Sequence, residues 1–127
     1  GLAIAHWLKA QTQVERVLHP GLPGDPCHSI WLKDFLGASG LFGLILKPTT
    51  KAALVAMLDG MELFKMGYSW GGYESLIIPT DPRGQRTATS WKAPGPMLRI
   101  HAGLEHLDDL IYDLEHGLAR LNAESQR

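Results

Sequence analysis

The sequence predicts an α/β (α+β-like) chain with a mixed, largely antiparallel sheet and helices packed on one face. Segments with helical spacing of apolar residues alternate with short apolar segments. The last two of these short segments follow each other with no helical segment between them, which favours antiparallel pairing. Apolar types make up 45% of the 127 residues and charged types 20%, so the chain can bury a core. We expect residues 1–127 to form a single domain.

Apolar residues at helical spacing predict four helices. The first covers residues 2–13 and has no capping residue before it. The second opens at Asp25-Pro26, which suit the cap and first position of a helix, and stops at Gly37. The third begins after Thr49 or Thr50 and ends at Gly60, and the fourth runs from Leu104 towards the C-terminal end.

Short apolar or β-branched segments predict the strands. They cover residues 14–18, 41–46 and 97–101, a segment at 74–78 that Pro79 stops, and a short one at 63–65. Residues 79–96 hold four of the eight prolines and show no period, so they are predicted to be a long loop.

Composition and charge exclude several classes of function. The net charge of -1, from 12 basic and 13 acidic residues, does not favour a nucleic-acid partner. No apolar run approaches the about 20 residues of a membrane span, and no signal peptide opens the chain. The single Cys27 excludes an internal disulfide, and the six histidines form no close ligand pair, so no metal site is expected. We expect a cytoplasmic protein.

The segment Tyr68-Ser69-Trp70-Gly71-Gly72 is the most unusual in the sequence. Two adjacent glycines let the backbone approach a ligand closely, Ser69 could donate a hydrogen bond, and Trp70 could wall a pocket. The alternative is a tight turn whose aromatic rings lie in the core. Residues 68–73 are named the aromatic–glycine loop below.

Charged residues near the C-terminal end allow two interpretations. Arg99 lies between apolar neighbours, and His101 has the same parity. Simple alternation would place both on a solvated face, whereas a functional Arg99 would hold a carboxylate through its two-pronged guanidinium. The acidic set Glu105, Asp108 and Asp109 is predicted to be a solvated face that complements the dipole of the last helix.

Three stretches, residues 37–42, 63–76 and 98–111, resemble one family. They are similar to the C-terminal part of bacterial cystathionine β-lyases, which belong to the pyridoxal-phosphate (PLP) enzymes of Cys/Met metabolism. The string Ser-Trp-Gly-Gly-Tyr-Glu-Ser-Leu, residues 69–76, is specific. The related γ-synthases and γ-lyases usually carry Leu where this chain has Trp70, which points to the β-lyase branch.

The resemblance implies a fold, a reaction and roles for four residues. The chain would be the small C-terminal domain of a fold-type I PLP enzyme that cleaves cystathionine to homocysteine, pyruvate and ammonia, with PLP as electron sink. By position, Arg99 would bind the α-carboxylate of the substrate. Tyr68 and Trp70 would line the substrate pocket, and Ser69 would help to position the catalytic lysine.

The sequence also departs from the family. The Schiff-base lysine and the other PLP contacts belong to a larger preceding domain with no counterpart here, so no residue is assigned to cofactor binding. The lysines of this chain, Lys47, Lys51, Lys65 and Lys92 among them, lie outside the Schiff-base motif. We therefore expect the chain alone to bind no PLP and to have no lyase activity.

The resemblance further implies a homo-oligomer for the full-length family. Leu2 would fall inside the helix that links the two domains. The chain alone could self-associate through apolar surface around Leu2, Ile4 and the aromatic–glycine loop. The alternative interpretation is a non-catalytic module that binds a small molecule or dimerises, since no complete catalytic set is present.

Overall fold

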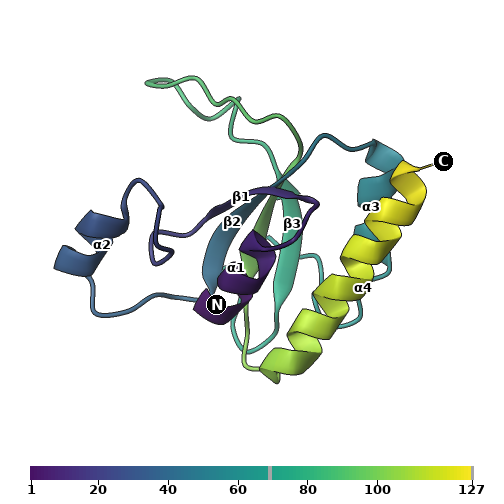
Figure 1. The fold of residues 1–127 in the computed structure, drawn as a ribbon, viewed down its shortest axis with the longest axis horizontal. Helices are drawn as coiled ribbons and strands as arrows, with labels where there is room; N and C mark the ends of the chain where they lie inside the picture. The colour runs from purple at the N-terminus through teal and green to yellow at the C-terminus, as the bar shows by residue number, and fades with distance from the viewer. Residues whose placement is uncertain (69, 127) are drawn as a thin grey trace.

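The computed structural model describes residues 1–68 and 70–126. These residues form four helices and four strands in the order α1 (Leu2–Lys9), β1 (Val14–Leu18), α2 (His28–Asp34), β2 (Leu41–Leu46), α3 (Lys51–Asp59), β3 (Leu76–Thr80), β4 (Met97–His101) and α4 (Leu107–Ser125). Their arrangement in space is shown in Figure 1. No helix among the described residues is both long and apolar enough to cross a membrane.

The four strands form one sheet in the order β1-β2-β4-β3, and each neighbouring pair is antiparallel. This confirms the predicted fold class. Arg99 lies in the interior strand β4, where it pairs with Gly43 of β2 on one side and with Ile78 of β3 on the other. The sheet therefore fixes the backbone of Arg99 from both sides.

The core lies between one face of the sheet and the helices α1, α3 and α4 (Figure 1). In β4 the side chains of Leu98 and Ile100 are fully buried in this core, while Arg99 and His101 alternate with them and are half-buried. The alternation predicted for β4 is therefore confirmed. Both side chains lie on the sheet face opposite the core.

Helices α3 and α4 pack closely because Gly117 has no side chain. A Cβ at Gly117 would lie 2.7 Å from the sulfur of Met61, which is too close for a real contact. One turn further on, Arg120 donates from Nε to the carbonyl oxygen of Ala56 at 3.2 Å. Arg120 thereby satisfies a carbonyl group near the C-terminal end of α3.

The segment between α3 and β3 is held by one buried carboxylate. Asp113, on the inner side of α4, is only 5% exposed. Its Oδ1 accepts from the backbone N–H of Glu62 at 2.9 Å, and its Oδ2 accepts from those of Leu63 at 2.8 Å and Phe64 at 3.0 Å. Three backbone donors that the helix and sheet leave unpaired are thus satisfied together.

The first two helices are shorter than predicted. Helix α1 ends at Lys9, because the N–H groups of Ala10 and Gln11 bond three residues back and turn the chain towards β1. Helix α2 begins at His28, since the carboxylate of Asp25 accepts from the N–H of Cys27 and forms a local turn instead of a cap. It ends before Phe35, whose backbone is extended.

Helix α2 also lies apart from the sheet (Figure 1). None of its residues is buried, and Ile30, Phe35 and Leu36 of this segment are exposed. Helix α2 therefore presents open apolar surface, whereas Ile4, where such surface was expected, is buried against the core. The expectation for Ile4 was wrong because the core-facing side of α1 is already covered within this chain.

The remaining differences concern the borders of β3 and α4. Strand β3 begins at Leu76 and continues through Pro79, which an edge strand tolerates because half of its N–H groups do not enter the ladder. The predicted strand at 63–65 is reduced to one parallel bridge between Lys65 and Leu76. Helix α4 begins at Leu107, and Leu104 is an exposed residue before it.

Candidate functional site

Strand β4 and the aromatic–glycine loop meet at the side chain of Arg99. Its Nη2 donates to the carbonyl oxygen of Tyr68 at 2.9 Å. A guanidinium group is planar and presents its N–H donors in fixed directions, so this bond orients the whole group at the edge of the loop. The structure therefore brings together Arg99 and Tyr68, to which the family resemblance assigns one site.

The rings of the loop point away from the core. Tyr68 is 92% exposed and Trp70 is 74% exposed, and Tyr73 is exposed as well. The interpretation of a tight turn with buried aromatic rings is therefore wrong for the rings, although Gly71 does form a turn with a positive φ of 81°. The predicted role of Ser69 falls on a residue outside the described part of the chain.

Glu105, which precedes α4, binds Ser75, which follows the aromatic–glycine loop. Its Oε1 accepts from the backbone N–H of Ser75 at 2.7 Å, and its Oε2 accepts from the Ser75 hydroxyl at 2.8 Å. The Ser75 hydroxyl oxygen accepts in turn from the N–H of Gly103 at 2.9 Å, and Leu104 donates to the carbonyl oxygen of Tyr73 at 2.8 Å. The expectation of a solvated acidic face holds for Asp108 and Asp109, which are exposed, but not for Glu105, which is half-buried and bonded to Ser75.

The sequence did not predict this pair, because no local spacing connects Ser75 with Glu105. They are 30 residues apart and meet only after β3 and β4 have paired. The one signal was indirect, because Ser75 and Glu105 both occur in the stretches that carry the family resemblance.

Glu105 should make stability depend on pH. Burial alone would raise its pKa, but hydrogen bonds from the backbone and hydroxyl of Ser75 outweigh this and hold the pKa below its ordinary value of 4.5. The carboxylate therefore stabilises the fold fully above that pH and loses the effect as the pH falls through the folded-state pKa. In the 127-residue chain, Glu105→Gln should cost about 1 kcal/mol at pH 7, because these bonds are partly screened by water.

Thermal unfolding of the wild type and Glu105→Gln between pH 7 and pH 3 measures this effect. The difference between the two midpoints should shrink as the pH falls below 4.5. Glu115→Gln is the matched control at an exposed position of α4. A difference that stays constant across this pH range would contradict the assignment.

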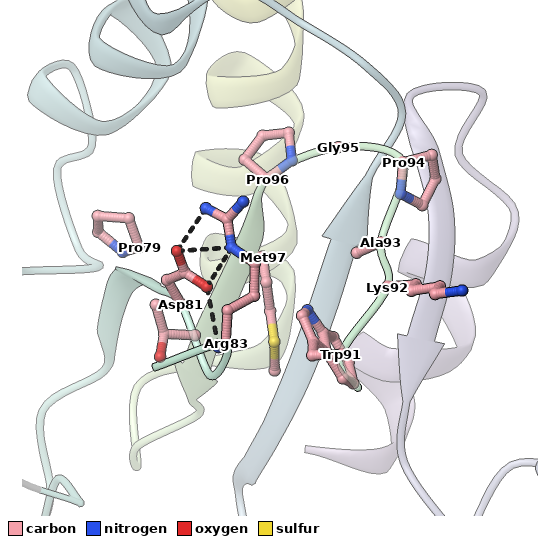
Figure 2. A pocket seen from close by; sticks show the side chains of 11 residues that line it. Pro79, Asp81, Arg83, Trp91, Lys92, Ala93, Pro94, Gly95, Pro96 and Met97 are labelled. Carbon is pink, nitrogen blue, oxygen red and sulfur yellow. Dashed lines mark hydrogen bonds and ion pairs between the residues drawn. The ribbon is translucent and has the colours of Figure 1, made fainter. Parts of the chain in front are cut away.

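A separate pocket lies at the other end of the β3–β4 pair (Figure 2). Residues 79–81, 83 and 91–97 line it, and none of Tyr68, Trp70 and Arg99 is among them. Two of the lining residues, Asp81 and Arg83, form a two-pronged ion pair, and the hydrogen bonds from Arg83 lower the pKa of Asp81 to about 2. The pair is local and exposed to solvent, so it contributes little to stability.

The described residues do not fit a complete PLP site. Lysines that form Schiff bases are activated by removal from water, and four of the lysines of this chain, Lys47, Lys51, Lys65 and Lys92, are all exposed. The described residues also contain no cluster of three His, Cys, Asp or Glu side chains that could hold a metal ion. What the site offers is a cation and exposed aromatic rings, a set suited to binding an amino acid.

Comparison with known proteins identifies the family to which this chain belongs. Residues 1–119 match the family described as Cys/Met metabolism PLP-dependent enzymes. The chain belongs to that family, and the resemblance seen in the sequence is confirmed. The chain spans about 31% of the length of the curated relatives that it matches.

Several similar relatives carry the names of particular enzymes. The cystathionine beta-lyase of Salmonella typhimurium is 51% identical over 124 residues, which cover 94% of this chain and 31% of the relative. Cystathionine beta-lyase MetC of Escherichia coli is 46% identical over the same share of each chain. An L-alanine/L-glutamate racemase of Wolbachia pipientis is 41% identical and covers 94% of this chain and 30% of the relative.

Solved structures agree with the sequence comparison. Cystathionine gamma synthase of Xanthomonas oryzae, in complex with cystathionine, superposes with a TM-score of 0.78 at 31% identity. The match covers 95% of this chain and 32% of that one. Arg99 and the Ser75–Glu105 pair therefore lie in a fold that this chain shares with cystathionine gamma synthase.

Proposed function

We propose that this chain supplies the substrate-carboxylate site of a PLP-dependent carbon–sulfur lyase that cleaves cystathionine by β-elimination. The observation that carries the proposal is the placement of Arg99. A cation on an interior strand is oriented by the Tyr68 carbonyl beside exposed aromatic rings. The most similar relatives named above are cystathionine beta-lyases.

Each residue has a distinct part in this proposal. Arg99 binds the α-carboxylate of the substrate through paired hydrogen bonds and so fixes the direction of the bonds at Cα. Tyr68 and Trp70 line the space around the thioether chain, and Ser69 positions a catalytic lysine supplied by the rest of the enzyme. PLP, when bound there, serves as the electron sink for the reaction.

In the same proposal residues 1–127 act as one domain of a larger, cytoplasmic, homo-oligomeric enzyme. The 31% share of the relatives supports this, since the remaining two thirds would carry the cofactor. The rival function with a specific observation in its favour is racemisation, because the Wolbachia racemase is 41% identical. A non-catalytic module is the third candidate.

A composite enzyme tests the proposal. In it, this chain replaces the segment that it matches in the Salmonella typhimurium lyase, an exchange between sequences that are 51% identical. We expect the composite enzyme to release pyruvate from cystathionine and the 127-residue chain alone to release none. Racemisation of alanine without pyruvate release would favour the racemase, and a folded composite enzyme without either activity would favour the module.

A further inference from the structure

His101 contacts the aromatic–glycine loop at its turn. It is the last residue of β4 and lies on the same face as Arg99. Its Nε2 is 3.0 Å from the carbonyl oxygen of Gly72. A carbonyl oxygen only accepts, so Nε2 carries the proton in this contact. The other ring nitrogen, Nδ1, is buried and has no hydrogen-bond partner in the described part of the chain.

The imidazole ring also packs against the backbone of Gly71. A Cβ at Gly71 would overlap Cδ2 and Cγ of His101, and the φ of 81° is one that other residues rarely adopt. Gly71 is therefore required on two grounds. Its backbone has to take a left-handed conformation, and it has to lie directly on the ring of His101.

These two contacts place His101 between the fixed ends of the loop. Arg99 holds the loop at the carbonyl of Tyr68, and Leu104 holds it at the carbonyl of Tyr73. The residues between these points include Trp70, whose exposed ring receives little support from the core. Between these two points, His101 contacts the loop at Gly71 and Gly72.

We propose that His101 is a positioning residue that fixes the Gly71–Gly72 turn and, through it, the direction in which Trp70 faces the substrate. The proposal rests on the proposed function, because it needs the loop to line the substrate pocket. In this proposal His101 does not bind the substrate itself. It acts through the backbone of the loop, and a displacement of about 1 Å in such a site lowers rates on the order of 100-fold.

Three variants of the composite enzyme separate the two contacts. His101→Ala removes both and should lower kcat/KM for cystathionine by roughly 10- to 100-fold. His101→Gln keeps an amide donor in the place of Nε2 and should stay within about threefold of the wild type. His101→Phe keeps a ring without a donor and should fall between them. His6→Ala, at an exposed histidine of α1, is the matched control.

Gly71→Ala supplies a test by coupling. Alone it should lower kcat/KM, because its Cβ overlaps the ring of His101. When His101→Ala is present in the same protein, this overlap is absent. Gly71→Ala should then lower kcat/KM by a smaller factor than it does in the enzyme that keeps His101. Purely additive effects would overturn the contact between ring and backbone as the cause.

Hydrogen–deuterium exchange gives a readout that does not depend on activity. His101→Ala should increase deuterium uptake in the peptide that covers residues 66–74 and leave β2 unchanged, and His101→Gln should restore protection. Unchanged uptake and kinetics in His101→Ala, or a His101→Gln enzyme as impaired as His101→Ala, would overturn the proposal. If the wild-type composite enzyme lacks lyase activity, the proposed function fails, and the exchange experiment alone decides the role of His101.

Discussion

Replacing Arg99 by Ala in the composite enzyme is expected to lower kcat/KM for cystathionine by about 100- to 1000-fold. A two-pronged bond between a guanidinium and a carboxylate is among the strongest hydrogen-bonded contacts, and its loss typically costs about 3–4 kcal/mol in a water-poor site. KM should rise strongly, because the carboxylate loses its partner. The turnover number kcat should fall as well, because the substrate is no longer held in one orientation.

Steady-state kinetics with cystathionine measures both parameters. Arg99→Lys is the matched variant, since it keeps the charge but cannot form two parallel hydrogen bonds, and it should recover only part of the loss. Arg16→Ala, at an exposed position of β1, is the control for removal of a cation. If Arg99→Ala leaves KM and kcat unchanged, Arg99 belongs to a solvated face and the proposed carboxylate site is wrong.

Replacing Asp113 by Ala is expected to lower the free energy of unfolding of the 127-residue chain by about 3–5 kcal/mol. The substitution leaves the N–H groups of Glu62, Leu63 and Phe64 without an acceptor in a mostly buried place. An unsatisfied buried donor costs about 1–3 kcal/mol, and these three are adjacent, so the total is less than their sum. The loss is a large part of the stability of a small domain.

Urea denaturation followed by circular dichroism measures the change. Asp109→Ala, one turn earlier on α4 and exposed, is the matched control and should alter stability by less than about 0.5 kcal/mol. Asp113→Asn keeps one acceptor oxygen and should recover part of the loss. Equal effects of Asp113→Ala and Asp109→Ala would show that the α3–β3 segment does not depend on this carboxylate.

The parts of the fold that could be predicted are those that local pattern determines. Strands β1, β2 and β4 have the predicted borders, because alternation or a continuous apolar run defines each of them. Thr50 caps α3 as expected, with its hydroxyl accepting from the N–H of Ala53 at 3.1 Å. Helix α2 was predicted to be a longer, packed helix because its apolar residues have helical spacing, but spacing does not say whether a partner surface is present.

In the candidate site, too, some features could be predicted from the sequence and others could not. The resemblance drew attention to Tyr68, Trp70 and Arg99, and the structure places the side chain of Arg99 on the backbone of Tyr68. It could not indicate that Ser75 and Glu105 bind each other, or that His101 lies against Gly71. Those contacts join residues about 30 positions apart, and they depend on the register of β3 with β4.

In the proposed function, Arg99 binds the α-carboxylate of the amino-acid substrate. A crystal structure of the composite enzyme with cystathionine bound tests it most directly. We expect both carboxylate oxygens within about 3 Å of the guanidinium nitrogens of Arg99, with Tyr68 and Trp70 beside the thioether chain. A substrate whose α-carboxylate is held by other residues, with Arg99 turned to solvent, would contradict the account.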